Sequence, residues 1–322
     1  MQAFSRTFLK TSSMTTGNFK YIDPTTVSTS NEPLKKTWAK VDGPGTSFEY
    51  IHHPNSVENV RGQESKFSTD ISGFALYKET AREKSFRDDD QVRATYYEDV
   101  ENLLRSKLPG VKKVVIFDHT IRRREKSSPR QPVQQVHVDQ TPAAAEARVR
   151  RHLPTEEAEQ LIKGRYQIIN VWRPIENPAS DFPLAVVDWR STTQDDFVNV
   201  DLLYPKRQAN GTNGTNGTHD DDDRGKEVLP TAGPKSTEGY EVKGETYAVK
   251  PSDKHKFYYM KDMTPEEVMF IKCFDSKSET MLGDKAKGIA HCTPHTAFVD
   301  PDTPEDAPGR QSIEVRCLVF YE

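Results

Sequence analysis

The segment QVHVDQT, residues 135–141, places a histidine and a carboxylate two positions apart among alternating valines. Side chains at positions i and i+2 of a β-strand point to the same face. We therefore expect His137 and Asp139 to point together, with Val136 and Val138 packed on the opposite side. An imidazole beside a carboxylate is two thirds of the two-histidine, one-carboxylate set that binds iron(II) and leaves coordination positions open. The alternative is a polar pair on the wet face of an ordinary strand.

A third ligand has to come from a distant part of the chain. The segment GIAHCTPHTAFVDP, residues 288–301, contains two histidines. His295 comes directly before the apolar residues of a predicted strand, whereas His291 lies in the loop that precedes it. The pattern of residues leaves both histidines open as the third ligand.

A second group of polar residues follows in GRQSIEVRCLVF, residues 309–320. Strand alternation puts Arg310, Ser312, Glu314 and Arg316 on one face. A guanidinium can bind a carboxylate through two parallel hydrogen bonds, and a hydroxyl adds one more. This face therefore suits a dicarboxylate cosubstrate, and either arginine is a candidate anchor.

Residues of a further predicted strand are candidates for a substrate pocket. In NVWRPI, Asn170 and Trp172 share one face of the strand, and Arg173 lies on the other. A tryptophan at such a position is also an ordinary core residue. We predict Asn170, Trp172 and Arg173 as pocket residues, with the core reading kept open for Trp172.

The predicted elements that position these side chains are mostly strands. Alternating or β-branched segments predict strands at 112–123, 133–141, 165–175 and 183–191, and more short strands after residue 235. A capped amphipathic segment predicts a helix at 88–107. Residues 141–164 are predicted to form two helices divided at Pro154. The pattern favours a mainly β fold, an antiparallel sandwich or barrel with helices packed outside.

Composition limits the class of protein. The 322 residues are 34% hydrophobic and carry a formal net charge of −4 from 45 basic and 49 acidic residues. This near balance argues against a nucleic-acid-binding surface, and no apolar run is long enough to span a membrane. The three cysteines have no disulfide-framework or zinc-site spacing, which favours a reducing compartment such as the cytoplasm. The first 20 residues are acid-free and rich in hydroxyl groups, which is also typical of a mitochondrial presequence.

The predicted organisation is an extended N-terminal arm over residues 1–45 and a single domain over 46–322. That domain contains a predicted disordered insertion at about 207–235. The insertion is centred on NGTNGTNGTHDDDDRGK, residues 210–226, which has too few apolar side chains to form a core.

An ordered set of segments resembles a known family. The segments are HVDQTP, RVRRHLP, QIINVWRPI, PLAVVD, FIKCFDS, PHTAF and RQSIEVRCLVFY. Together they resemble a fungal hydroxylase/desaturase family, which includes gibberellin desaturase-like proteins and tailoring enzymes of secondary-metabolite pathways. The resemblance covers roughly residues 17–322 apart from the Asn-Gly-Thr insertion.

This resemblance implies a double-stranded β-helix, or jelly-roll, core. It also implies an oxygenase that uses iron(II), 2-oxoglutarate and O2, with ascorbate as an aid in vitro, to hydroxylate or desaturate a small molecule. Carried over residue by residue, it implies His137, Asp139 and His295 as iron ligands. It implies Arg310 with Ser312 as the 2-oxoglutarate anchor and Arg316 as the alternative anchor.

Two other functions remain open from the sequence. One is a metal-dependent jelly-roll enzyme that does not use 2-oxoglutarate. The other is a small-molecule binding module without catalysis, because a fold does not dictate a function. The expected partner is a small-molecule substrate, and the sequence leaves the oligomeric state open.

Overall fold

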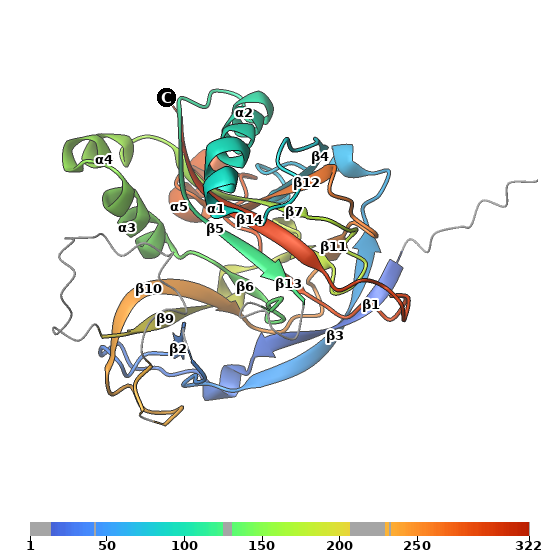
Figure 1. Cartoon of the computed structure of the whole chain (residues 1–322). Coiled ribbons are helices and arrows are strands. Elements are labelled where there is room, and N and C mark those ends of the chain that lie inside the picture. Colours follow the sequence, from blue (N-terminus) through green and yellow to red (C-terminus); the bar gives the residue numbers. More distant parts are fainter. Residues whose placement is uncertain (1–13, 42, 125–130, 207–228, 232, 322) are drawn as a thin grey trace, which may run out of the picture.

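The computed structural model describes residues 14–41, 43–124, 131–206, 229–231 and 233–321. Two β-sheets face each other, with helix α2 packed against the outer side of the smaller one (Figure 1). The larger sheet has the strand order β1 (Met14–Ile22), β3 (Tyr50–Asn59), β11 (Phe257–Tyr259), β8 (Leu184–Val187), β13 (His295–Ala297), β6 (His137–Val138), β10 (Tyr240–Val249), β9 (Phe197–Pro205), β2 (Trp38–Lys40). The smaller sheet has the order β4 (Phe74–Lys78), β12 (Glu267–Asp275), β7 (Tyr166–Pro174), β14 (Gln311–Phe320), β5 (Lys113–Arg123).

This arrangement confirms the predicted class, a mainly β jelly roll with flanking helices. The helices are α1 (Asp89–Gln91), a π-helical turn (Val92–Tyr96), α2 (Tyr97–Lys107), α3 (Pro142–His152), α4 (Thr155–Leu161) and α5 (Glu279–Leu282). The helix predicted over 88–107 and the pair divided at Pro154 are therefore confirmed. The side chain of Asp88 caps the first of them by accepting hydrogen bonds from the backbone N–H groups of Asp90 and Gln91, at 2.9 and 3.3 Å.

The smaller sheet separates two apolar layers. Along β14, Ile313, Val315 and Cys317 pack with the buried side of α2. On the same strand, Ser312, Glu314 and Arg316 face a cavity between the two sheets. This division fixes the register of β14. A slip of one residue would turn the polar side chains toward the helix layer and the apolar ones toward the cavity.

The described part of the predicted N-terminal arm is extended and pairs into the larger sheet. β1 pairs with β3 along its whole length, and β2 pairs with β9. The physical reason is aromatic burial, since Phe19 stacks on Phe257 with ring centroids 3.8 Å apart. The predicted strand at 133–141 is also shorter than expected, with only His137–Val138 in ladder pairing.

Two predicted segments, the presequence-like N-terminus and the insertion, lie largely outside the described residues. Residues 1–13 and most of the predicted insertion, 207–228 and 232, lie outside the described residues. The insertion falls between β9 and β10, whose ladder begins with Tyr240 opposite Pro205. Within the described part of the chain, no helix is long and apolar enough to cross a membrane.

Candidate metal centre

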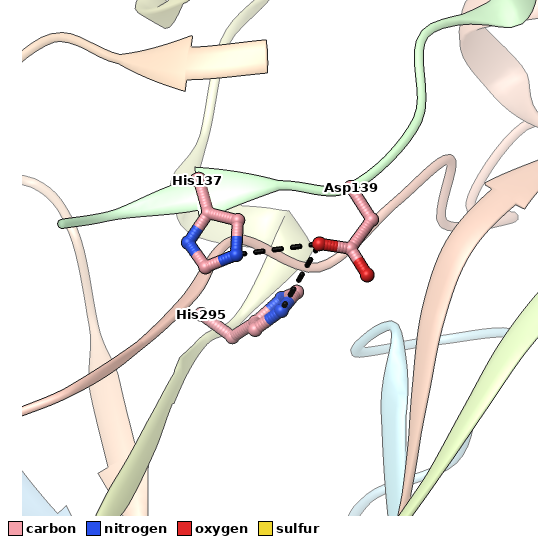
Figure 2. Close-up of side chains that lie close together, drawn as sticks. All are labelled: His137, Asp139 and His295. Carbon is pink, nitrogen blue, oxygen red and sulfur yellow. Dashed lines mark ion pairs between the residues drawn. The ribbon is translucent and has the colours of Figure 1, made fainter. Parts of the chain in front are cut away.

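Three side chains converge between the sheets from two neighbouring strands. His137 lies on β6, Asp139 directly follows that strand, and His295 begins β13. His295 pairs opposite His137 in the ladder, so the fold brings together residues 158 positions apart in the sequence. One nitrogen of each imidazole and one oxygen of the carboxylate all lie within 4.8 Å of one another. Figure 2 shows the three side chains pointing toward one another.

A backbone carbonyl fixes the ring orientation of each histidine through its Nδ1 atom. Nδ1 of His137 lies 2.8 Å from the carbonyl oxygen of Gln135, and Nδ1 of His295 lies 3.0 Å from that of Thr293. A carbonyl only accepts, so each Nδ1 carries a proton and each Nε2 is the atom directed at the cluster. The Nε2 atoms are 3.3 and 4.0 Å from the same oxygen of Asp139, Oδ1. Metal-binding histidines are held in this way by a partner on the second ring nitrogen.

Asp139 is held through its other oxygen. Oδ2 accepts a hydrogen bond from the side-chain amide of Asn170, at 2.8 Å, and one from Nε of Arg316, at 3.1 Å. The same guanidinium also donates to Asp118, at 2.6 Å, and to Glu314, at 2.7 Å. One arginine therefore faces three carboxylates, and the two formal negative charges left over suit a divalent cation.

These contacts control the protonation of the group. Burial opposes the ionised form of Asp139, but the charge of Arg316 and the hydrogen bond from His137 hold its pKa well below the usual range. For His137, burial is outweighed by the hydrogen bond and charge of Asp139, which raise the pKa. Burial and the nearby His137 lower the pKa of His295. The carboxylate is thus ionised and ready to bind a cation at neutral pH.

The second histidine that the sequence left open lies elsewhere. Nδ1 of His291 is 2.8 Å from the hydroxyl of Ser278, and the ring packs against Trp189 and Phe274. Burial lowers its pKa to about 4. His291 is not part of the cluster of ligand atoms, whereas His295 is.

A small cavity of about 40 Å³ extends from the cluster toward the smaller sheet. The predicted polar face of β14 lines it: Arg310, Ser312, Glu314 and Arg316. Trp172 also lines this cavity and lies beneath Arg310, with the guanidinium carbon 5.6 Å from its ring centroid. Trp172 is at the same time part of the apolar core, and its place in a substrate pocket stays a prediction.

The two arginines of this face have different surroundings. Arg310 is buried, donates one hydrogen bond to the carbonyl of Phe182 at 2.7 Å, and has no partner for its Nε. Among the described residues, no carboxylate forms an ion pair with its guanidinium, while Arg316 is engaged by three. Burial lowers the pKa of Arg310 to about 9. An anion would therefore stabilise Arg310 far more than Arg316.

Two of the three predicted pocket residues, Asn170 and Arg173, make contacts within the protein. Asn170 lies at the cluster, as a hydrogen-bond partner of Asp139 rather than in an open pocket wall. Arg173 lies on the other face of β7, where its guanidinium donates to the carbonyls of Glu79 and Pro265 and lies over Tyr96. Strand alternation makes this unavoidable, because residues 172 and 173 face opposite sides.

Asp118 and Thr120, which were not among the predicted site residues, hold the guanidinium of Arg316 from β5. Their signal was present, because two polar residues at spacing two interrupt the β-branched run KVVIFDHTIRR. A jelly roll with a His-x-Asp pair and a distant histidine between its sheets defines the class of metal-dependent enzymes to which iron(II) oxygenases belong.

The comparisons with known proteins agree with this class. A family described as "Oxidoreductase/YMDC permease-like domain" matches residues 19–223 and 231–320. The hydroxylase/desaturase efuI of Hormonema carpetanum is 31% identical over 86% of each chain. The hydroxylase/desaturase CTB9 of Cercospora beticola is 32% identical over 83% of this chain and 76% of its own. The solved iron and alpha-ketoglutarate-dependent endoperoxidase NvfI superposes with a TM-score of 0.74 at 25% identity, covering 96% of this chain and 98% of that one.

The chain therefore belongs to the fungal hydroxylase/desaturase family that its sequence resembles.

Proposed function

We propose that this chain is an iron(II)/2-oxoglutarate-dependent oxygenase that hydroxylates or desaturates a small molecule of secondary metabolism. The observation that carries the proposal is the cluster of His137, Asp139 and His295, whose ligand atoms lie within 4.8 Å of one another. Two imidazole nitrogens and one carboxylate oxygen are the donor set of non-haem iron(II) oxygenases. The names and iron dependence of the relatives support the same activity.

The residues fit the metal that the family implies. Nε2 of His137, Nε2 of His295 and Oδ1 of Asp139 would hold iron(II), and the remaining contacts of these side chains keep those atoms directed inward. When bound, iron(II) would activate O2, the oxidant, for attack on an unactivated C–H bond; 2-oxoglutarate would supply two electrons and one oxygen atom of O2 would end in the succinate formed from it, with release of carbon dioxide. The protein provides binding, orientation and exclusion of water.

We assign the cosubstrate anchor to Arg310, assisted by Ser312. The support is electrostatic, because this buried guanidinium faces the small cavity without a carboxylate partner among the described residues. A bidentate contact with the far carboxylate of 2-oxoglutarate would supply that partner. Arg316 is assigned to holding Asp139, since its N–H groups already bind three carboxylates.

The test is anaerobic reconstitution with iron(II), followed by absorption spectra with and without 2-oxoglutarate. A weak metal-to-ligand charge-transfer band should appear only when both are present, and it should be absent from Asp139→Ala. Bound iron without such a band would indicate a metal enzyme that does not use 2-oxoglutarate. A protein that binds neither would be a binding module without this chemistry.

A further inference from the structure

We propose that the substrate binds in a second, larger cavity and is an apolar small molecule that carries hydrogen-bond-accepting oxygens. The inference rests on the proposed function, because it assigns the cavity relative to the metal cluster. It names a site and a substrate class that the predicted pocket residues Asn170, Trp172 and Arg173 do not describe.

The larger cavity has a volume of about 380 Å³, which is in the range of small-molecule sites. It reaches the metal cluster, since His137 and Asp139 line both this cavity and the small one. From there it extends along the larger sheet, bounded by described residues between 39 and 50, by β9 and β10, and by α3. A molecule in this cavity would reach the cluster away from Arg310 and Ser312, which line only the small cavity.

Apolar side chains form one part of the walls of the larger cavity. Phe48, Val200, Leu202 and Ala248 line it, and three of these four also belong to one hydrophobic cluster. Packing a hydrocarbon or ring skeleton against them is favourable, because it removes apolar surface from water. This part of the cavity therefore suits the apolar skeleton of the ligand.

The polar groups in the larger cavity are mainly hydrogen-bond donors. Lys40 and Arg148 line it and can only donate, and the amides of Gln135 and Gln140 line it as well. Among the described residues that line this cavity, Asp139 is the one carboxylate, and it belongs to the metal cluster. A ligand with hydrogen-bond-accepting oxygens would therefore match these donors.

Three of these donors keep unused capacity among the described residues. The ammonium of Lys40 donates to the carbonyl of Gly233, at 3.1 Å, and lies 4.5 Å from the ring centroid of Tyr240. One hydrogen bond leaves two of its three N–H groups. The Gln135 amide oxygen accepts from the hydroxyl of Tyr50, so its two N–H groups remain. The buried Gln140 side chain has no hydrogen bond to another described residue.

The test uses three fluorescent naphthalene probes, because the natural ligand is unidentified. Anilinonaphthalene sulfonate has anionic oxygens, propionyl-(dimethylamino)naphthalene has a neutral ketone oxygen, and phenylnaphthylamine has no oxygen. The full chain should bind the first two at least about fivefold more tightly than the third, since each acceptor adds a hydrogen bond. Comparing the sulfonate with the ketone tells whether the class is acidic or carbonyl-bearing.

Variants locate the binding. Lys40→Met should weaken binding of the sulfonate probe about tenfold and change phenylnaphthylamine by less than twofold. Lys35→Met is the matched control, because Lys35 is an exposed lysine nearby that pairs with Glu32. Leu202→Trp should fill the cavity and weaken all three probes, whereas Val242→Trp, at an exposed position of β10, should weaken none. If Lys40→Met does not fold, Gln140→Leu removes a different hydrogen-bond donor from the cavity and serves as the second test.

Two results would overturn the proposal. One is equal binding of all three probes with no selective effect of Lys40→Met or Gln140→Leu. The other is displacement of the probes by 2-oxoglutarate with iron(II), which would make the larger cavity the cosubstrate site. Failure of the proposed function is seen separately, as loss of the charge-transfer band in the unmodified chain.

Discussion

Asp139 is a carboxylate whose two oxygens have different surroundings. Oδ2 is bound by Asn170 and Arg316, and Oδ1 faces the two histidine Nε2 atoms. This division predicts that Asp139 binds a metal through one oxygen only. It also explains how a carboxylate can sit between two sheets, since a buried charge is costly unless it is paired and hydrogen-bonded.

Substitution of the cluster tests the ligand assignment. Alanine in place of His137, Asp139 or His295 should lower iron(II) affinity by more than about 100-fold in each case. Loss of an outer hydrogen-bond partner of a metal ligand costs up to about 100-fold, and loss of the ligand itself should cost more. His291→Ala should retain stoichiometric iron, because its ring contacts Ser278 and two aromatic residues instead of the cluster. Anaerobic equilibrium dialysis measures both. Iron retained by His295→Ala and lost from His291→Ala would mean that the third ligand is wrongly assigned.

Replacing Arg310 or Arg316 with leucine should affect different steps, cosubstrate binding in one variant and iron binding in the other. Arg310→Leu should raise the apparent KM for 2-oxoglutarate about 30-fold, from the roughly 2 kcal/mol of a charge-assisted hydrogen bond, and leave iron affinity unchanged. Arg316→Leu should instead lower iron affinity by about 10- to 100-fold, because Asp139 loses the group that holds it. Steady-state kinetics and metal titration on both variants check this. An unchanged KM in Arg310→Leu would move the anchor elsewhere.

At the scale of elements, a buried ionic network supports the loop that leads into β13. Lys272 of β12 is fully buried and its ammonium contacts Asp275, at 2.7 Å, Asp70, at 2.9 Å, and the carbonyl of Ala290, at 3.2 Å. The backbone N–H of Thr293 donates to the carbonyl of Lys272. Because the carbonyl of Thr293 in turn binds His295, this network indirectly sets the position of a candidate ligand.

Lys272→Met should therefore be costly. Removing one partner from a buried ion pair costs about 3–5 kcal/mol of unfolding free energy, because Asp275 is left without its main counter-charge. Urea denaturation at neutral pH measures the loss. Lys277→Met is the control, because Lys277 is exposed and forms no ion pair within the described part of the chain; it should change stability by less than about 0.5 kcal/mol.

The same network predicts a pH dependence. Burial alone would raise the pKa of Asp275, but Lys272 and Arg165 outweigh it and lower the pKa from 3.8 to about 2. A carboxyl whose pKa is lowered by folding contributes stability that is complete above its unfolded pKa and is lost as the pH falls toward its folded pKa. The difference in stability between the unmodified chain and Lys272→Met should thus shrink between about pH 4 and pH 2. A constant difference across that range would contradict the assigned pairing.

At the scale of the whole molecule, the candidate site exists only where the two sheets meet. The larger sheet contributes the cluster and the smaller sheet contributes Arg310, Ser312 and the groups that hold Asp139. Unpacking the sheets would separate these residues without breaking either sheet. Metal binding should therefore stabilise the packed state by mass action, as for any ligand that binds only the folded protein.

The insertion is predicted to be dispensable for this packing. Residues 210–226 lie outside the described residues, but they fall between β9 and β10, which pair antiparallel and can be joined by a short turn. Replacing them with a Gly-Ser linker should leave turnover and Tm nearly unchanged, because the segment is polar and rich in glycine and aspartate. A control linker of equal length separates shortening from composition. A large loss of turnover would assign a functional role to the segment.

Local patterns in the sequence determined the elements and the faces of the strands. The alternation in QVHVDQT placed His137 and Asp139 together, and the alternation in RQSIEVRC separated the polar set of β14 from its apolar set. The capped amphipathic helix over 89–107 was readable for the same reason. Each of these features depends on neighbours within a few residues, where periodicity and capping act.

Only the tertiary structure decided how those faces meet. His295 rather than His291 joins the cluster because β13 lies beside β6, and Arg316 is neutralised because Asp118 lies opposite it on β5, 198 positions away in the sequence. The same holds for β1, whose aromatic residues have partners only in the assembled sheet, and for the larger cavity, whose walls come from six separate segments. The physical reason is that strand order and sheet packing depend on contacts between distant residues, which no local periodicity encodes.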